Sequence, residues 1–261
     1  MNEDRADHLE ATDENADHEA GYAYRVVTVR EAVERCVCGE WDIADFQRQF
    51  VWRPSQVCGL ADSLWRNYPF GSLLLWRARE DGNGERRVRW WIADGHQRLT
   101  SLCILSGREP IWLRRRAAES PRPAPLQFEP CFDASADAAA AFVAVRAGDA
   151  ARDPHLVPVG RLLALDPDEA RGQAELRKLA ETLKTEKGCR GMDPAELYRR
   201  LSRVSMLDRR ELAATVVWQE REHVLEIFAR LNSRGMRFRR LLLKLAMEEI
   251  PAALRGARRA D

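Results

Sequence analysis

A strand-to-helix transition at residues 87–103 constrains this chain more than any other stretch of its sequence. Apolar side chains recur at a period of two through residues 88–92, which predicts a strand. The apolar residues of 99–103 then fall on one face of a helix. Residues 94–98 therefore form a polar turn, in which a strand ends and a helix begins.

This polar turn has two interpretations. In the first, Gly95 adopts a backbone conformation closed to other residues, the free N–H groups of the helix start point outward, and Arg98 adds a forked donor, as in a phosphate cradle. In the second, Asp94 caps the helix and Gln97 reaches back in a capping box, without any ligand. His96 and Arg98 favour the cradle, because a capping box needs neither.

Composition indicates a folded cytoplasmic protein. The chain has 261 residues, of which 45% are hydrophobic and eight are Trp, so a sizeable core can form. Its six cysteines show no paired C-x-x-C spacing and are expected to be free thiols of a reducing compartment. The sequence contains no apolar run near the roughly 20 residues of a membrane span, and its acidic start is unlike a signal peptide.

The distribution of apolar residues divides the chain into three parts. Residues 1–21 carry almost no large apolar side chain and are expected to form a disordered acidic leader. Residues 22–250 contain the strand and helix patterns and are expected to form one domain. Residues 251–261 form a basic tail.

Within the domain, the patterns predict a helix from Val29 to Gly39, an extended run at 41–52 and a helix that starts near Pro54. From about residue 167 the chain is expected to be mainly helical. The further strands that we predict are 73–77, which leads through a hairpin at 81–84 into the strand before the polar turn, then 110–113, an edge strand at 126–129, and 212–218.

A helix is also predicted from Glu222, because Val224, Ile227, Phe228 and Leu231 are spaced i, i+3, i+4 and i+7. It ends at the turn 232–235, and a second helix with apolar residues between 238 and 245 follows. From spacing alone, the turn is a helix–helix connection in which Gly235 is left-handed.

Three motifs together resemble a known family. They are Phe46–Gln47–Arg48 with Phe50–Val51–Trp52, then 94–102 (DGHQRLTSL), then 228–235 (FARLNSRG). In this order they are similar to the hallmarks of the GmrSD restriction-endonuclease N-terminal domain family. The resemblance implies an α+β fold, with a ParB/sulfiredoxin-like core, a mixed sheet and a helical C-terminal portion.

The resemblance also implies a function. The expected role is a nucleotide-binding, NTP-hydrolysing sensor or regulatory component of a restriction-type defence system against foreign or modified DNA, such as that of phage. Its partners would be DNA and a separate nuclease subunit, because the basic region beyond Gly235 contains no histidine for an HNH-type nuclease. The alternative is a non-catalytic ParB-like adaptor that binds DNA. The preferred nucleotide, the DNA modification and the oligomeric state stay open.

The implied site surrounds the polar turn. Catalytic roles fall to Asp94, His96, Gln97 and Arg98, with Mg²⁺ held by Asp94. The residues implied to bind the nucleoside triphosphate are Gln47, Arg48, Gly95, Thr100, Asn232 and Ser233. This chain departs from the family at His96, where relatives usually have a second glutamine, and at Ala44, where a proline is common.

Overall fold

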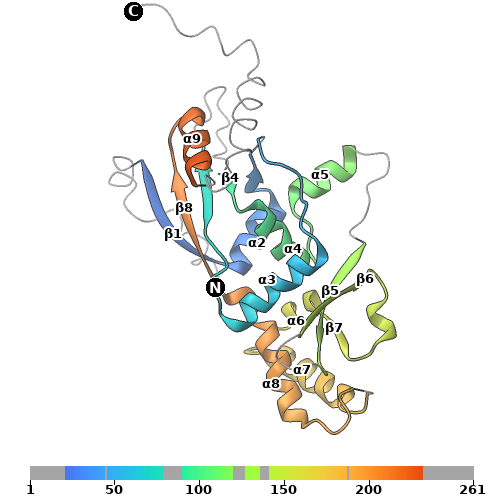
Figure 1. Ribbon diagram of the computed structural model, residues 1–261. Coiled ribbons are helices and arrows are strands. Elements are labelled where there is room, and N and C mark those ends of the chain that lie inside the picture. Colours follow the sequence, from blue (N-terminus) through green and yellow to red (C-terminus); the bar gives the residue numbers. More distant parts are fainter. Residues whose placement is uncertain are drawn as a thin grey trace, which may run out of the picture.

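The computed structural model in Figure 1 describes most of the predicted domain. The described residues are 21–44, 46–78, 90–119, 127–135, 141–186 and 188–231. Several predicted parts therefore lie outside the described residues: the expected leader up to residue 20, the hairpin turn at 81–84, the turn with Asn232 and Ser233, the helix expected after it and the basic tail.

Five strands form a mixed sheet in the order β1-β8-β3-β4-β2. They are β1 (Tyr22–Thr28), β2 (Trp41–Ile43), β3 (Leu73–Arg77), β4 (Trp90–Asp94) and β8 (Glu211–Val217). β1 is antiparallel to β8, β8 parallel to β3, β3 antiparallel to β4, and β4 parallel to β2. This arrangement confirms the predicted α+β class with a mixed sheet, and the strands expected before the polar turn, at 73–77 and near 212–218.

The strand directions bring several turns to one end of this sheet. β2 and β4 end there, whereas β3 and β8 begin there, as the pairs Leu74↔Asp94 and Leu73↔Ala214 show. The register between β3 and β4 shifts near this end from Leu75↔Ile92 to Leu74↔Asp94, so Ala93 is the extra residue of a β-bulge. The polar turn, the loop before β3 and the residues before β8 are consequently neighbours.

Helices cover both faces of the sheet. Leu73, Leu75 and Ile92 face the large core, to which α2 (Val29–Cys38), α3 (Pro54–Arg66) and α4 (His96–Leu105) also contribute buried side chains. The alternate residues Leu74, Ala93 and Val217 pack with Val224 of α9 (Arg221–Leu231). Figure 1 shows α2 and α4 on one side of β4 and α9 on the other.

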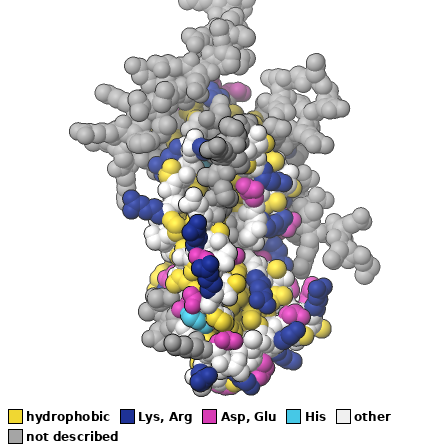
Figure 2. All heavy atoms as spheres, turned by 90° about the vertical axis from the view of Figure 1, so that its right-hand side faces the viewer, with side chains coloured by type: hydrophobic (Ala, Val, Ile, Leu, Met, Phe, Trp, Pro, Cys, Tyr) yellow, Lys and Arg dark blue, Asp and Glu magenta, His cyan; other side chains and the backbone are white. Residues whose placement is uncertain are grey.

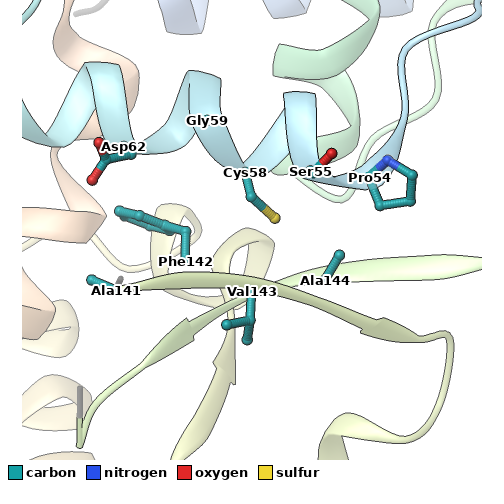
Figure 3. A pocket seen from close by; sticks show the side chains of 9 residues that line it. All are labelled: Pro54, Ser55, Cys58, Gly59, Asp62, Ala141, Phe142, Val143 and Ala144. Carbon is teal, nitrogen blue, oxygen red and sulfur yellow. The ribbon is translucent and has the colours of Figure 1, made fainter. Parts of the chain in front are cut away.

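A second, three-stranded antiparallel sheet packs on the far side of α3. Its strands are β5 (Phe128–Asp133), β6 (Phe142–Arg146) and β7 (Leu156–Pro158), in the order β6-β5-β7. Trp65 of α3 meets the rings of Phe132 and Phe142 with centroids 5.6 and 6.1 Å apart. Figure 3 shows Phe142 pointing toward α3 beside a cavity of about 470 Å³.

The other helices of the described residues are α5 (Ile111–Glu119), which packs against α2 and β2, and α6 (Val159–Leu163), α7 (Ala170–Leu183) and α8 (Pro194–Ser205). Two 3₁₀ turns, η1 (Ala150–Arg152) and η2 (Leu207–Arg209), are also described. Figure 1 places α7, α8 and the small sheet at one end of the molecule, away from α9. None of the helices in the described part of the chain is long and apolar enough to cross a membrane.

One strand prediction was wrong, and a second was wrong about the position of the strand in its sheet. Residues 110–113 begin α5, because Pro110 offers its carbonyl to the N–H groups of Leu113 and Arg114 at the start of a helix. The strand expected at 126–129 is confirmed from Phe128, where β5 begins, but β5 is the central strand of its sheet rather than an edge strand. In both cases a short apolar run was assigned without knowing its tertiary partners.

Two helical glycines give a matched test of the packing. A Cβ added to Gly59 of α3 meets no atom within 4 Å, so Gly59→Ala is expected to raise the free energy of unfolding by about 0.5–1 kcal/mol. A Cβ on Gly172 of α7 would lie 1.8 Å from the Asp166 carbonyl oxygen, so Gly172→Ala should lower it by about 1–3 kcal/mol. Urea denaturation measures both changes, and equal effects would contradict the described packing.

Candidate functional site

The polar turn is built around Gly95. β4 ends at Asp94, α4 begins at His96, and Gly95 is the N-cap with φ +97°. A Cβ at this buried glycine would be strained by that φ and would lie 2.5 Å from Leu73 Cδ2. The Leu99 N–H donates to the Gly95 carbonyl at 3.0 Å, so the N–H groups before Leu99 lack an acceptor within the helix.

The capping-box interpretation is wrong. The N-cap is Gly95 rather than Asp94, and no side chain caps the helix. Gln97 is buried and bonds elsewhere: its Oε1 accepts from the Val51 N–H at 2.9 Å, and its Nε2 donates to the Gln49 carbonyl at 2.8 Å. One amide side chain thus bonds to the extended segment 46–52 as a neighbouring strand would.

Segment 46–52 is also attached to the sheet and to α9. The Gln47 side chain donates from Nε2 to the carbonyl of Ala93, the bulged residue of β4. The ring of Phe46 lies 5.6 Å from the ring of Phe228 in α9. The first motif therefore touches both the second motif and the beginning of the third.

His96 is buried, with 4% of its surface exposed. Its Nε2 lies 2.7 Å from Gln97 Nε2, which can only donate, so the imidazole accepts this hydrogen bond in its neutral form. Burial lowers the pKa of His96 to about 4, although hydrogen bonds with the backbone of Arg48 and Gln49 oppose this shift. The geometry gives His96 a positioning role beneath segment 46–52.

Arg98 is the partly buried cation of the site. Its side chain is 17% exposed, Nη1 donates to the Phe70 carbonyl at 3.3 Å, and Nη2 lies 3.6 Å from Asp94 Oδ2. A Cβ on Gly71, whose φ is +90°, would lie 2.5 Å from Arg98 Nη1, so the guanidinium packs directly against this glycine. Burial lowers the pKa of Arg98, and Asp94 opposes the shift.

The guanidinium of Arg98 has little compensation for its burial. It stays charged at any working pH and carries five N–H donors. Within the described residues its contacts are one long hydrogen bond and one ion pair beyond hydrogen-bonding distance. A partly desolvated cation with spare donors favours the approach of an anion.

The other predicted site residues differ in placement. Arg48 is exposed, and its charge helps to lower the pKa of His96, so it lies close to the turn. Thr100 is fully buried, and its Oγ1 accepts from Trp112 Nε1 at 3.1 Å, so the structure does not bring it to the surface with Arg98. Asn232 and Ser233 lie beyond the described end of α9.

The loop of Phe70 and Gly71 was missed by the sequence analysis. Its signal was the sequence Pro69–Phe70–Gly71 immediately before a strand, a pattern typical of a tight loop. Its partnership with Arg98 depends on the pairing of β3 with β4, which local sequence does not show.

A metal at this site would need phosphates as additional ligands. Among the described residues, no group of three or more His, Cys, Asp or Glu side chains is placed to hold a metal ion. Asp94 offers one carboxylate, and its side chain is 36% exposed. Mg²⁺ is often bound by one or two carboxylates together with substrate phosphates, so the donor set fits a nucleotide-bound Mg²⁺.

These features define an α+β protein in which a strand–glycine–helix turn presents a partly buried arginine at the end of a mixed sheet. A comparison with protein-family models matches residues 33–241 to the GmrSD restriction endonuclease, N-terminal domain. The match includes all three motifs, and the chain belongs to this family. A comparison with curated proteins found no match. The ParB-like core stays a prediction.

The buried His96 predicts a pH dependence of stability. Its pKa is about 4 in the folded protein and near 6.5 when exposed, so the unfolded chain binds more protons in this window. The free energy of unfolding should therefore fall by about 3 kcal/mol between pH 7 and pH 4 through this group alone. In the variant His96→Gln, the free energy of unfolding should fall by about 3 kcal/mol less over the same pH range. Urea denaturation at both pH values measures this difference. Identical pH profiles would show that His96 is not buried in neutral form.

The Gln97 contacts predict a local change in dynamics. In Gln97→Ala the Val51 N–H loses its acceptor, so its hydrogen exchange should accelerate at least tenfold, with the loss of about 1–3 kcal/mol of stability. Gln56→Ala is the control, because the Gln56 side chain also accepts a backbone N–H, from Arg53, but at the start of α3. Unchanged exchange at Val51 in Gln97→Ala would contradict the contact.

Proposed function

We propose that this protein is a nucleotide-binding sensor or regulatory component of a restriction-type defence system, and that the phosphates of a nucleoside triphosphate bind at Arg98. The family match supports the restriction-type system. The single observation that supports the nucleotide site is the partly buried Arg98 guanidinium, which has spare donors beside the start of α4.

Each proposed contact with the nucleotide uses a side chain or a backbone group of the polar turn or of segment 46–52. Arg98 donates a forked pair of hydrogen bonds to phosphate oxygens, next to the N–H groups at the start of α4. Asp94, whose Oδ2 lies 3.6 Å from Arg98 Nη2, would hold the Mg²⁺ that arrives with the phosphates or would orient a water. When bound, Mg²⁺ would neutralise part of the phosphate charge. The exposed Arg48 adds a second cation from segment 46–52.

The proposed domain also hydrolyses the nucleotide and recognises foreign or modified DNA. It senses nucleotide and DNA, and a separate nuclease subunit cuts the DNA. The restriction family supports a partnership of this kind.

The alternative is a ParB-like adaptor that binds DNA without catalysis. Such a protein gains affinity mainly from phosphate contacts, so its binding falls steeply with salt. On the face shown in Figure 2, Lys and Arg side chains lie among acidic and hydrophobic ones rather than in one continuous basic field. Strong salt dependence of DNA binding without any effect of nucleotide would favour this adaptor.

Calorimetric titration with each of the four NTPs in the presence of Mg²⁺ tests the nucleotide site. Loss of the charge-assisted contact in Arg98→Ala should cost about 1.5–3 kcal/mol, or roughly ten- to a hundredfold in affinity. Arg98→Lys should recover only part of the affinity, because lysine lacks the planar fork.

The matched control is Arg152→Ala, which removes an arginine with an 81% exposed side chain in η1 and should leave nucleotide affinity unchanged. If no NTP binds to the wild-type protein, or if Arg98→Ala binds as tightly as wild type, the phosphate site is not at Arg98.

A further inference from the structure

A cleft lies beside the proposed phosphate site at the same end of the sheet. Its volume is about 690 Å³, within the range of small-molecule sites. One wall is the loop from Asn67 to Ser72, and the other is the stretch from Arg209 to Ala213, at the start of β8. The cavity of Figure 3 is elsewhere, between α3 and β6, and its one acidic side chain, Asp62, pairs with Arg66.

The cleft shares a wall with the Arg98 site. Phe70 and Gly71 line the cleft, and the same two residues hold Arg98 through the Phe70 carbonyl and the close approach at Gly71. β3 lies between β4 and β8, and neighbouring strands are about 4.8 Å apart, so the ends of β4 and β8 are roughly 10 Å apart. A ligand of nucleotide size spans this distance.

The side chains of the cleft differ from those at Arg98. Tyr68 is 57% exposed, and Phe70 is half-buried, so aromatic surface is available for stacking. Asn67 and Glu211 offer an amide and a carboxylate, groups that read base edges and sugar hydroxyls by hydrogen bonding. These are the groups that a nucleoside requires.

The two arginines of the cleft are not equivalent. Arg209 is engaged with Asp166 and Asp168. Within the described residues, the neighbouring Arg210 side chain makes no ion pair, so its guanidinium is available to a ligand. It lies on the opposite side of the cleft from the Tyr68 loop.

We propose that this cleft binds the base and sugar of the nucleotide whose phosphates meet Arg98. The inference rests on the proposed function and adds to it a second subsite, formed by the loop 67–72 and the start of β8. Arg98 then supplies affinity for any polyphosphate, whereas the cleft supplies the preference for a nucleoside.

A nucleic-acid strand is the competing occupant. A strand would use the same aromatic and basic groups but would continue beyond them, from one phosphate to the next. The aromatic and polar groups all line one cleft, which suits a single nucleoside. The carboxylate of Glu211 would also repel the phosphate backbone of a strand.

The test compares the NTPs with inorganic tripolyphosphate, both with Mg²⁺, by calorimetry on the full chain. Tyr68→Ala should weaken NTP binding about tenfold and leave tripolyphosphate binding unchanged, because only the nucleoside stacks. Tyr68→Phe keeps the ring and should bind the NTP like wild type. Tyr24→Ala is the control, because Tyr24 is 74% exposed on β1 and does not line the cleft. Arg98→Ala should weaken both ligands.

The outcomes separate the two proposals. Equal binding of NTP and tripolyphosphate by wild type, or an NTP affinity unaffected by Tyr68→Ala, overturns the nucleoside cleft while Arg98 still holds phosphate. A tripolyphosphate affinity unaffected by Arg98→Ala overturns the proposed function. If Tyr68→Ala weakens a single-stranded oligonucleotide but no NTP, the cleft is a strand groove and the inference is wrong. Binding of neither ligand by wild type overturns both.

Discussion

The candidate site depends on the bidentate hydrogen bonding of one amide side chain, that of Gln97. Segment 46–52 pairs with no strand among the residues that the structure describes, yet the Gln97 amide binds its backbone at Gln49 and Val51. A buried amide that is satisfied on both sides is rigid, because breaking either bond leaves an unpaired polar group. Gln47 and Arg48 are therefore placed by α4, the same helix that carries Arg98. The amide group of Gln47 and the basic groups of Arg48 and Arg98 are therefore positioned by one helix, whereas Asp94 lies at the end of β4.

The sequence predicted the elements of the site better than their partners. The alternation of apolar side chains at 88–92, together with Gly95, was enough to predict a strand, a tight turn and a helix. These local elements depend mainly on residues that are neighbours in the chain. The bonding of Gln97 was not predictable, since glutamine at this helical position suits a capping box equally well. The hydrogen bond of Thr100 was not predictable either. Its partner, Trp112, lies in α5, which the local apolar run had suggested was a strand. The contact of Gly71 with Arg98 needed the sheet order.

Arg98 links the stability of the fold to its proposed use. A cation placed against two glycines and a backbone carbonyl loses water without gaining a strong partner. Such an arrangement is unfavourable for the isolated protein and becomes favourable when an anion arrives. The neighbouring Asp94 moderates this effect without removing it, because its carboxylate lies 3.6 Å from the guanidinium. Natural proteins often concentrate unfavourable local features of this kind at sites of function.

The β-bulge at Ala93 makes the geometry of the site depend on chain length as well as on residue type. Side chains alternate between the two faces of a sheet, so one inserted or deleted residue exchanges the faces for everything beyond it. The extra residue at Ala93 sets which way Asp94 and the following turn are directed. A single-codon deletion there would leave every motif residue present and still change how the turn that carries Asp94 and Arg98 is directed relative to segment 46–52. For proteins built like this one, the spacing between strand and glycine is therefore as informative as the residues themselves.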